Sequence, residues 1–117
     1  MNVRAETFFK ALADQTRLRC LVLLQQEGEL CVCELTHALG MIQPKVSRHL
    51  AQLREGGIVS SRREGQWIFY RLHSQLPSWE KQVLRTTARA VADEEPFVSD
   101  RQNLADMPDR PRTSCCA

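Results

Sequence analysis

The chain has 117 residues, of which 43% are hydrophobic and 26% are charged, and its formal net charge is +2. This length suits one modest domain, and the composition is that of an ordinary globular protein rather than a disordered or fibrous one. No apolar run reaches the roughly 20 residues that cross a bilayer, and the first residues carry no apolar signal-peptide core, so we expect a cytoplasmic protein without a membrane partner.

Positive charge is concentrated in the middle of the chain. Residues 41–75 hold six Lys or Arg against two acidic residues, whereas residues 93–117 hold three Arg against six acidic residues. A basic segment of this kind is typical of a site for a polyanion such as DNA. Charge alone leaves open the alternative of an ordinary solvated basic face.

Two helices are predicted at the start of the chain. Apolar residues at helical spacing indicate a short helix over residues 6–12 and a longer one over residues 15–26. Asp14 is placed to cap the start of the second helix, and Gly28 is placed to end it. Cys20 falls on the apolar face of that helix and is expected in the core.

Two further helices are predicted in the middle of the chain. A helix of one to two turns spans residues 34–39 and ends at Gly40. The next begins at Pro44, a residue favoured in the first turn of a helix. Its inward stripe consists of Val46, Leu50 and Leu53.

Strand-forming residues follow at 58–63 and 67–72, joined by a turn that contains Gly65, and a last helix is predicted over residues 78–92. The order α-α-α-α-β-β-α, mainly helical with a small β-hairpin, is that of a winged helix-turn-helix. We expect residues 1–95 to form this domain. Residues 96–117, which include Cys115 and Cys116, are expected to form a flexible tail because they are rich in Pro and charge.

The helix that begins at Pro44 is the expected recognition helix. Its first turns present polar side chains and free backbone N–H groups, which suit phosphates and base edges. The predicted DNA contacts are Gln43, Lys45, Ser47 and Arg48 on this helix and Arg62, Arg63 and Gln66 at the hairpin. His49 is expected to be partly buried and hydrogen-bonded rather than a DNA contact.

The segment Cys31-Val32-Cys33 is a candidate site for a soft ion, because thiolates are soft ligands. Residues two apart point to the same side of a strand but diverge by about 200° in a helix. Both sulfurs can therefore hold one ion only if the chain around Val32 is non-helical. We hypothesise that ligation holds open the start of the following helix and displaces residues 43–48 from DNA. The alternative is that both cysteines are small buried hydrophobes.

Four stretches of the chain match the motifs of a known family. They read FKALADQTRL at residues 9–18, ELCVCEL at 29–35, QPKVSRHL at 43–50 and GQWIFYRL at 65–72. The first resembles the LADxTRL opening of ArsR/SmtB-family metalloregulators, and the second resembles the ELCVCDL motif of arsenic-resistance repressors. The other two are similar to the recognition helix and the wing of that family.

The resemblance implies a homodimeric transcriptional repressor, with residues 1–95 serving both DNA binding and dimerisation. The apo dimer then binds a palindromic operator, and the inducer As(III) or Sb(III) releases it by binding Cys31 and Cys33. No cofactor is required and no enzyme activity is expected, since no Gly-rich anion loop adjoins Cys31 as a reductase would need. A cadmium/lead or thiol-redox sensor of the same fold is the alternative.

The chain departs from the arsenic repressors at Thr36, where they carry a third cysteine. A third ligand could come from Cys115 or Cys116, from a small-molecule thiol, or be missing altogether. The Asp/His pairs that form another sensing site on the last helix of some family members have no counterpart here, because residues 78–92 contain neither residue type.

Overall fold

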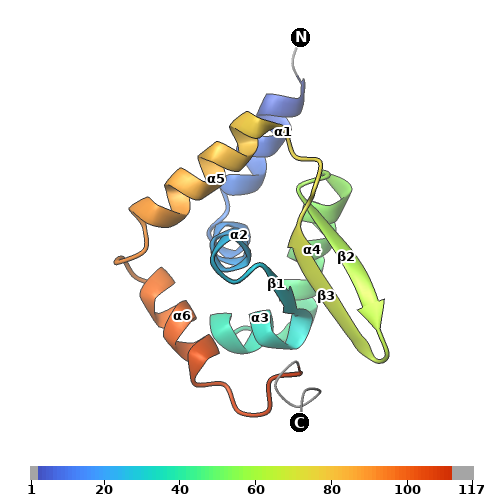
Figure 1. Ribbon diagram of the computed structural model, residues 1–117, viewed down its shortest axis with the longest axis vertical. Helices are drawn as coiled ribbons and strands as arrows, with labels where there is room; N and C mark the ends of the chain where they lie inside the picture. The colour runs from blue at the N-terminus through green and yellow to red at the C-terminus, as the bar shows by residue number, and fades with distance from the viewer. Residues whose placement is uncertain (1–2, 112–117) are drawn as a thin grey trace.

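The computed structural model of the protein describes residues 3–111. In chain order the elements are α1 (Val3–Leu12), α2 (Gln15–Glu27), β1 (Glu29–Cys31), α3 (Val32–Leu39), α4 (Gln43–Glu55), β2 (Val59–Glu64), β3 (Trp67–Leu72), α5 (Ser78–Ala90) and α6 (Phe97–Ala105). A small antiparallel sheet with strand order β1-β3-β2 lies at one side of the helices (Figure 1). The predicted winged helix-turn-helix is thus confirmed. Within the described part of the chain, no helix is long and apolar enough to cross a membrane.

Helix α2 lies at the centre of the molecule. It buries the consecutive residues Cys20, Leu21, Val22, Leu23 and Leu24, so it contacts neighbours on several sides. Helices α1 and α5 lie together at one end, where the ring centroids of Phe8 and Trp79 are 5.3 Å apart. Helices α3 and α6 lie together at the other end (Figure 1).

Helix α2 begins at the predicted N-cap. Asp14 has an extended backbone, and its Oδ1 accepts a hydrogen bond from the Arg17 N–H at 3.0 Å. Partial burial acts to raise the pKa of the Asp14 carboxyl. The hydrogen bond from Arg17 and the positive charges of His49 and Arg17 outweigh this effect, so the pKa is lowered overall.

We expect Asp14→Ala to lower the free energy of unfolding by about 1 kcal/mol, the usual cost of a lost N-cap. The pKa of Asp14 in the folded protein lies below the ordinary value of 3.8. The stabilisation that depends on the Asp14 charge is therefore present in full above pH 3.8 and is lost as the pH falls through the folded pKa. Urea unfolding at neutral and progressively acidic pH measures the stabilisation from the capping hydrogen bond and the stabilisation from the charge. Asp14→Asn keeps a capping oxygen without the charge and is the matched control. A difference between wild type and Asp14→Asn that does not shrink in acid would contradict the charge-dependent part.

Helices α3 and α4 form the helix-turn-helix. Gly40 ends α3 at φ +65°, in the left-handed region that suits glycine, and its N–H donates to the carbonyl oxygens of Thr36 and His37. Helix α4 then begins at Gln43 with Pro44 in its first turn, as predicted. Its predicted inward stripe of Val46, Leu50 and Leu53 is fully buried.

Strands β2 and β3 form a hairpin that extends away from the helices (Figure 1). Gly65 at its tip has φ +61°, which the tight turn requires. The structure adds a third strand, β1, which pairs with β3 from Glu29 opposite Arg71 to Cys31 opposite Phe69. Sequence patterning missed β1 because three residues are too few to display an alternation.

The stretch after residue 96 differs from the expected flexible tail. Helix α6 packs on α3 and α2, with Leu104 buried in the main core. Asp100 is also buried, and it forms an ion pair with Arg19 of α2 at 2.6 Å. The expectation is therefore wrong for residues 97–111, because a few apolar contacts and one buried ion pair anchor a mostly polar segment. Cys115 and Cys116 lie outside the described residues.

Candidate functional site

The junction between β1 and α3 brings the two central cysteines together. Cys31 is the last residue of β1 and the N-cap of α3, with φ −83° and ψ 163°. Cys33 lies in the first turn of α3. Their sulfur atoms are joined as a disulfide, and their Cα atoms are 5.4 Å apart. The two side chains that were predicted to share one ion therefore converge on one point.

This geometry corrects part of the sequence-based hypothesis. Convergence of the two sulfurs was expected to need a non-helical chain around Val32. Val32 is in fact the first residue of α3, and the sulfurs meet because the backbone at Cys31 is extended. The start of α3 need not unwind for the two side chains to converge.

A capping box links the sensor cysteine to the helix start. The Glu34 N–H donates to Sγ of Cys31 at 3.4 Å, and the Cys31 N–H donates to Oε1 of Glu34 at 2.8 Å. This pair was not predicted from the sequence. The signal was present, since Cys31-x-x-Glu34 has the Ser/Thr-x-x-Glu spacing of a capping box with sulfur in place of the hydroxyl. An ion bound to Sγ of Cys31 would therefore lie directly at the start of α3.

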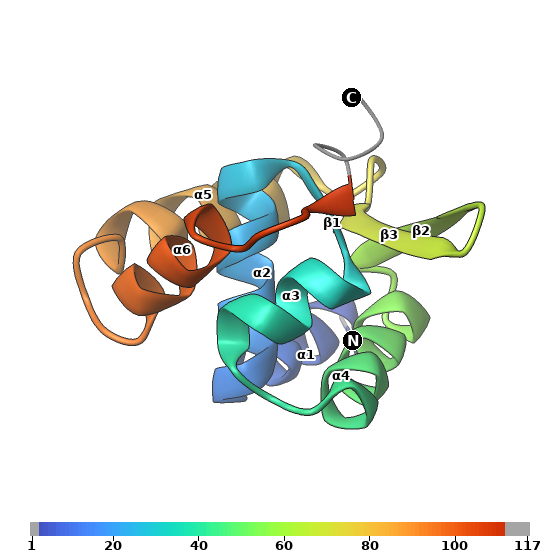
Figure 2. The same cartoon turned by 90° about the horizontal axis from the view of Figure 1, so that it is seen from below.

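The C-terminal segment returns to the same junction (Figure 2). Nε of Arg110 donates to Oε2 of Glu34 at 2.7 Å, and the guanidinium also lies 3.9 Å from a carboxylate oxygen of Glu27. Glu34 is fully buried, and a buried carboxylate needs such a partner. Arg110 therefore helps to hold the start of α3.

The residues of α4 that were predicted to contact DNA lie in its first two turns. Gln43, Lys45 and Arg48 are exposed along its first two turns, and Ser47 is half-buried. His49 is also half-buried, with Nδ1 lying 3.4 Å from Nη1 of Arg17. The prediction of a partly buried, hydrogen-bonded histidine is thus confirmed.

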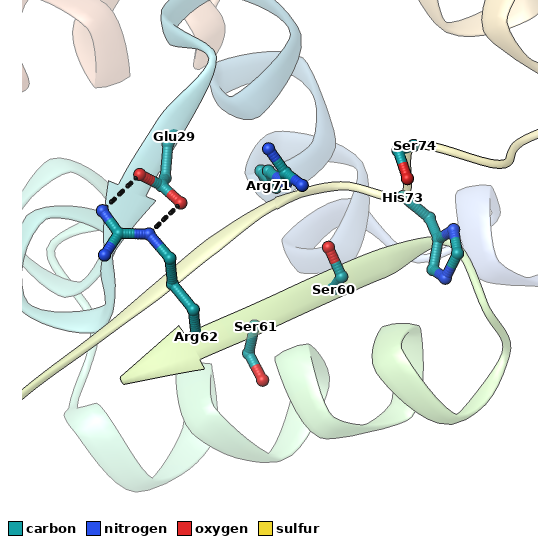
Figure 3. Close-up of a pocket in the computed structure, with 7 residues that line it drawn as sticks. All are labelled: Glu29, Ser60, Ser61, Arg62, Arg71, His73 and Ser74. Atoms are coloured by element: carbon teal, nitrogen blue, oxygen red, sulfur yellow. Dashed lines mark hydrogen bonds and ion pairs between the residues drawn. The ribbon is translucent and has the colours of Figure 1, made fainter. Parts of the chain in front are cut away.

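The predicted contacts of the hairpin differ from one another. Arg63 and Gln66 are exposed near its tip. Arg62 instead turns toward β1, where its Nε and Nη2 both donate to the Glu29 carboxylate at 2.8 Å (Figure 3). Its guanidinium also lies over the Phe69 ring, 4.7 Å from the centroid. Hydrogen bonds to the carboxylates of Glu29 and Glu64 raise the pKa of Arg62 above its ordinary value, so its guanidinium stays charged. A DNA phosphate would have to compete with these two carboxylates for the guanidinium.

Arg62 borders a polar hollow of about 340 Å³ on the sheet face that it shares with Glu29 (Figure 3). Ser60, Arg71 and His73 line it as well. Arg71 is exposed, as expected for a solvated strand residue. None of the three cysteines within residues 3–111 lines this hollow.

A second hollow, of about 380 Å³, joins the cysteine pair to the elements predicted to read DNA, and we call it the junction hollow. It is lined by Cys31, Val32 and Cys33 at the junction, by Gln43, Ser47, Ala51 and Arg54 of α4, and by Gln66, Trp67, Ile68 and Tyr70 of the hairpin. Five residues that the sequence singled out thus face one space. The apolar wall formed by the hairpin was not predicted, because it depends on how the hairpin packs against α3 and α4.

The remaining cysteine that the structure describes is unsuited to a ligand role. Cys20 is completely buried, and burial raises the pKa of its thiol to about 12, so it stays protonated. It is a core residue, as predicted. Within residues 3–111, no group of three or more His, Cys, Asp or Glu side chains is arranged to hold a metal ion.

The chain was compared with known proteins. The family described as "Bacterial regulatory protein, arsR family" matches residues 14–61. Over 105 residues the chain is 53% identical to the arsenic resistance transcriptional regulator ArsR1 of Pseudomonas putida. The aligned region covers 90% of this chain and 80% of that protein. The chain belongs to the arsR family. Members of this family that it resembles are transcriptional regulators with a helix-turn-helix DNA-binding fold, not enzymes.

Solved structures agree with the arsR-family fold. The homodimeric winged helix-turn-helix domain of Mb0332 from Mycobacterium bovis is 35% identical with a TM-score of 0.63, covering 78% of this chain and 80% of that one. The antimony-specific transcriptional repressor AntR is 33% identical with a TM-score of 0.64, covering 74% of this chain and 76% of that one. Both structures match the fold of this chain over at least three quarters of their own length.

Proposed function

We propose that this arsR-family protein is a repressor that responds to arsenite or antimonite. The apo dimer binds operator DNA, and a trivalent metalloid bound by the Cys31 and Cys33 thiolates releases it. The observation that carries the proposal is the junction hollow, where the cysteine pair, the start of α4 and the hairpin face one space. The arsenic-resistance and antimony-specific relatives support the choice of ion.

Binding of the ion by the two cysteines affects DNA binding in two ways. An ion held by Cys31 and Cys33 occupies the space that they share with Gln43 and Ser47. It also binds the Sγ atom that caps α3 and so changes the geometry at the start of this helix, and α3 packs directly on α4. A local bond to sulfur thereby shifts the recognition helix relative to the hairpin.

Dimerisation uses the end of the molecule where α1 meets α5. Phe9 is 50% exposed and Trp79 is 40% exposed, and their ring centroids lie 5.9 Å apart. An exposed aromatic pair on these two helices suits the helix packing that the family resemblance implies. A second copy of the chain would cover it and pair two recognition helices on one palindrome.

A second candidate function is thiol-redox sensing on the same fold. The disulfide between Cys31 and Cys33 favours it, because oxidation of the pair removes both thiolates. The two candidates differ in what releases DNA from the reduced protein. Arsenite does so for the first, whereas an oxidant does so for the second.

A mobility-shift titration tests the proposal with a DNA duplex that the reduced protein enriches from a random pool. We expect arsenite or antimonite to release the duplex and cadmium or lead to leave it bound. Lys45→Ala and Arg48→Ala should each weaken DNA binding about tenfold, since one good contact contributes about 1–3 kcal/mol. Arg101→Ala, which removes a cation on α6 away from α4 and the hairpin, is the matched control. A duplex that stays bound at saturating metalloid would contradict the proposal.

A further inference from the structure

We infer that the preferred inducer is a trivalent arsenical with one organic substituent, R–As(OH)₂, whose organic group lies in the junction hollow. This inference rests on the proposed function and specifies its ligand class. Four features carry it: two converging sulfurs, a missing third sulfur in the described chain, the size of the hollow and its apolar wall.

Trivalent arsenic forms three bonds, and the cysteine pair supplies two sulfurs. Thr36 has no thiol, and Cys20 is sealed in the core as a protonated thiol. Within residues 3–111 there is thus no third thiolate beside Cys31 and Cys33. A monosubstituted arsenical already carries one As–C bond, so two thiols complete its coordination.

The reaction is an exchange of ligands without a change of oxidation state. The two As–O bonds break and two As–S bonds form, while each thiol proton leaves with a hydroxyl group, which gives two molecules of water. Arsenic remains trivalent. The reaction needs Cys31 and Cys33 as thiols, so the disulfide must first be opened by a reductant, for which a phosphine serves in the experiment.

The hollow has room for the organic group beside the sulfurs. Its volume of about 380 Å³ falls in the range of small-molecule pockets and exceeds what a single arsenic atom fills. Both cysteines line it at one side, so a group attached to their shared arsenic atom enters it directly.

The wall formed by the hairpin is apolar. Trp67, Ile68 and Tyr70 line the hollow from β3, and Ala51 lines it from α4. Ile68 is 41% exposed, one of four large hydrophobic side chains exposed in the described chain, and it lies outside the hydrophobic core. An aryl or alkyl group against this wall removes apolar surface from water, which arsenite cannot do. Burial of one such group corresponds to about a ten- to hundredfold gain in affinity.

Calorimetric titration of the phosphine-reduced full chain tests the inference with phenylarsonous acid and with arsenite as probes. We expect phenylarsonous acid to bind at one per chain and about ten- to hundredfold more tightly than arsenite. Ala51→Leu fills the hollow and should remove most of this preference while arsenite binding is retained. Ala105→Leu, exposed at the end of α6, is the matched control and should keep the preference.

Ile68→Ser provides a second variant, because it removes part of the wall at an exposed position and does not depend on packing in the core. It should also weaken binding of phenylarsonous acid selectively. Equal affinities for the two probes, or variants that weaken both probes alike, would overturn the inference and leave the proposed function intact. A strong arsenite affinity that disappears in Cys115→Ser/Cys116→Ser would overturn it too, since a third thiolate would then come from those residues. Failure of both probes to bind would instead contradict the proposed function.

Discussion

The double variant Cys31→Ser/Cys33→Ser is expected to bind the operator duplex as tightly as the wild type does and to stay bound when arsenite is added. Serine offers no soft thiolate, so the ion has no ligands. Serine is also a preferred N-cap residue, and its hydroxyl oxygen can accept the Glu34 N–H in place of Sγ of Cys31. The start of α3, and with it the position of α4, should therefore be preserved.

A mobility-shift titration with increasing arsenite measures this outcome. The loss of DNA affinity caused by an allosteric effector, typically about 5- to 150-fold, should fall to none in the double variant. Cys20→Ala is the control, because Cys20 is buried in the core and does not line the junction hollow, so its replacement should leave the arsenite response in place. Release of DNA from the double variant at wild-type arsenite concentrations would refute the assignment of the two ligands.

Replacing Arg19 by leucine is expected to cost about 3–5 kcal/mol of unfolding free energy, because it leaves a buried carboxylate without its partner. Nε and Nη2 of Arg19 donate to the two oxygens of Asp100 at 2.8 and 2.6 Å. The Asp100 side chain is 2% exposed and the Arg19 side chain is 12% exposed. The hydrogen bond to Asp100 raises the pKa of Arg19, so the guanidinium stays charged.

Urea unfolding of three proteins checks this expectation. Arg19→Leu should be much less stable than wild type, whereas Arg19→Leu/Asp100→Leu should recover most of the loss, since the buried charge is then removed as well. Arg101→Leu is the matched control, because Arg101 follows Asp100 on α6 and its guanidinium donates to the carbonyl oxygen of Ala92. A double variant less stable than Arg19→Leu would show that the loss arises from packing and not from an uncompensated charge.

Local signals in the sequence were sufficient for most of the helix-turn-helix and the hairpin. The Asp14 cap, the stripe of Val46, Leu50 and Leu53, and the turn at Gly65 each depend on residues within one or two turns of chain. Such features are encoded by spacing and residue type. Their positions in the structure therefore match the predictions closely.

The features that escaped prediction depend on distant partners. Strand β1 is defined by pairing with β3, about forty residues further along the chain. The orientation of Arg62 is set by Glu29 of that same strand, and α6 is held by Asp100 against Arg19. The junction hollow likewise needs β1, α4 and the hairpin in place at once. No periodicity within one segment specifies such contacts.

The ion pair between Arg110 and Glu34 has a practical consequence for reporter design. A fluorescent domain fused after Ala117 would begin seven residues from the guanidinium that steadies the sensor junction. Such a fusion would be close in sequence to Arg110, so movement of the attached domain could break the ion pair that holds the start of α3. Ending the chain at residue 96 to obtain a smaller probe would remove both Arg110, the ion-pair partner of Glu34, and Asp100, the ion-pair partner of Arg19.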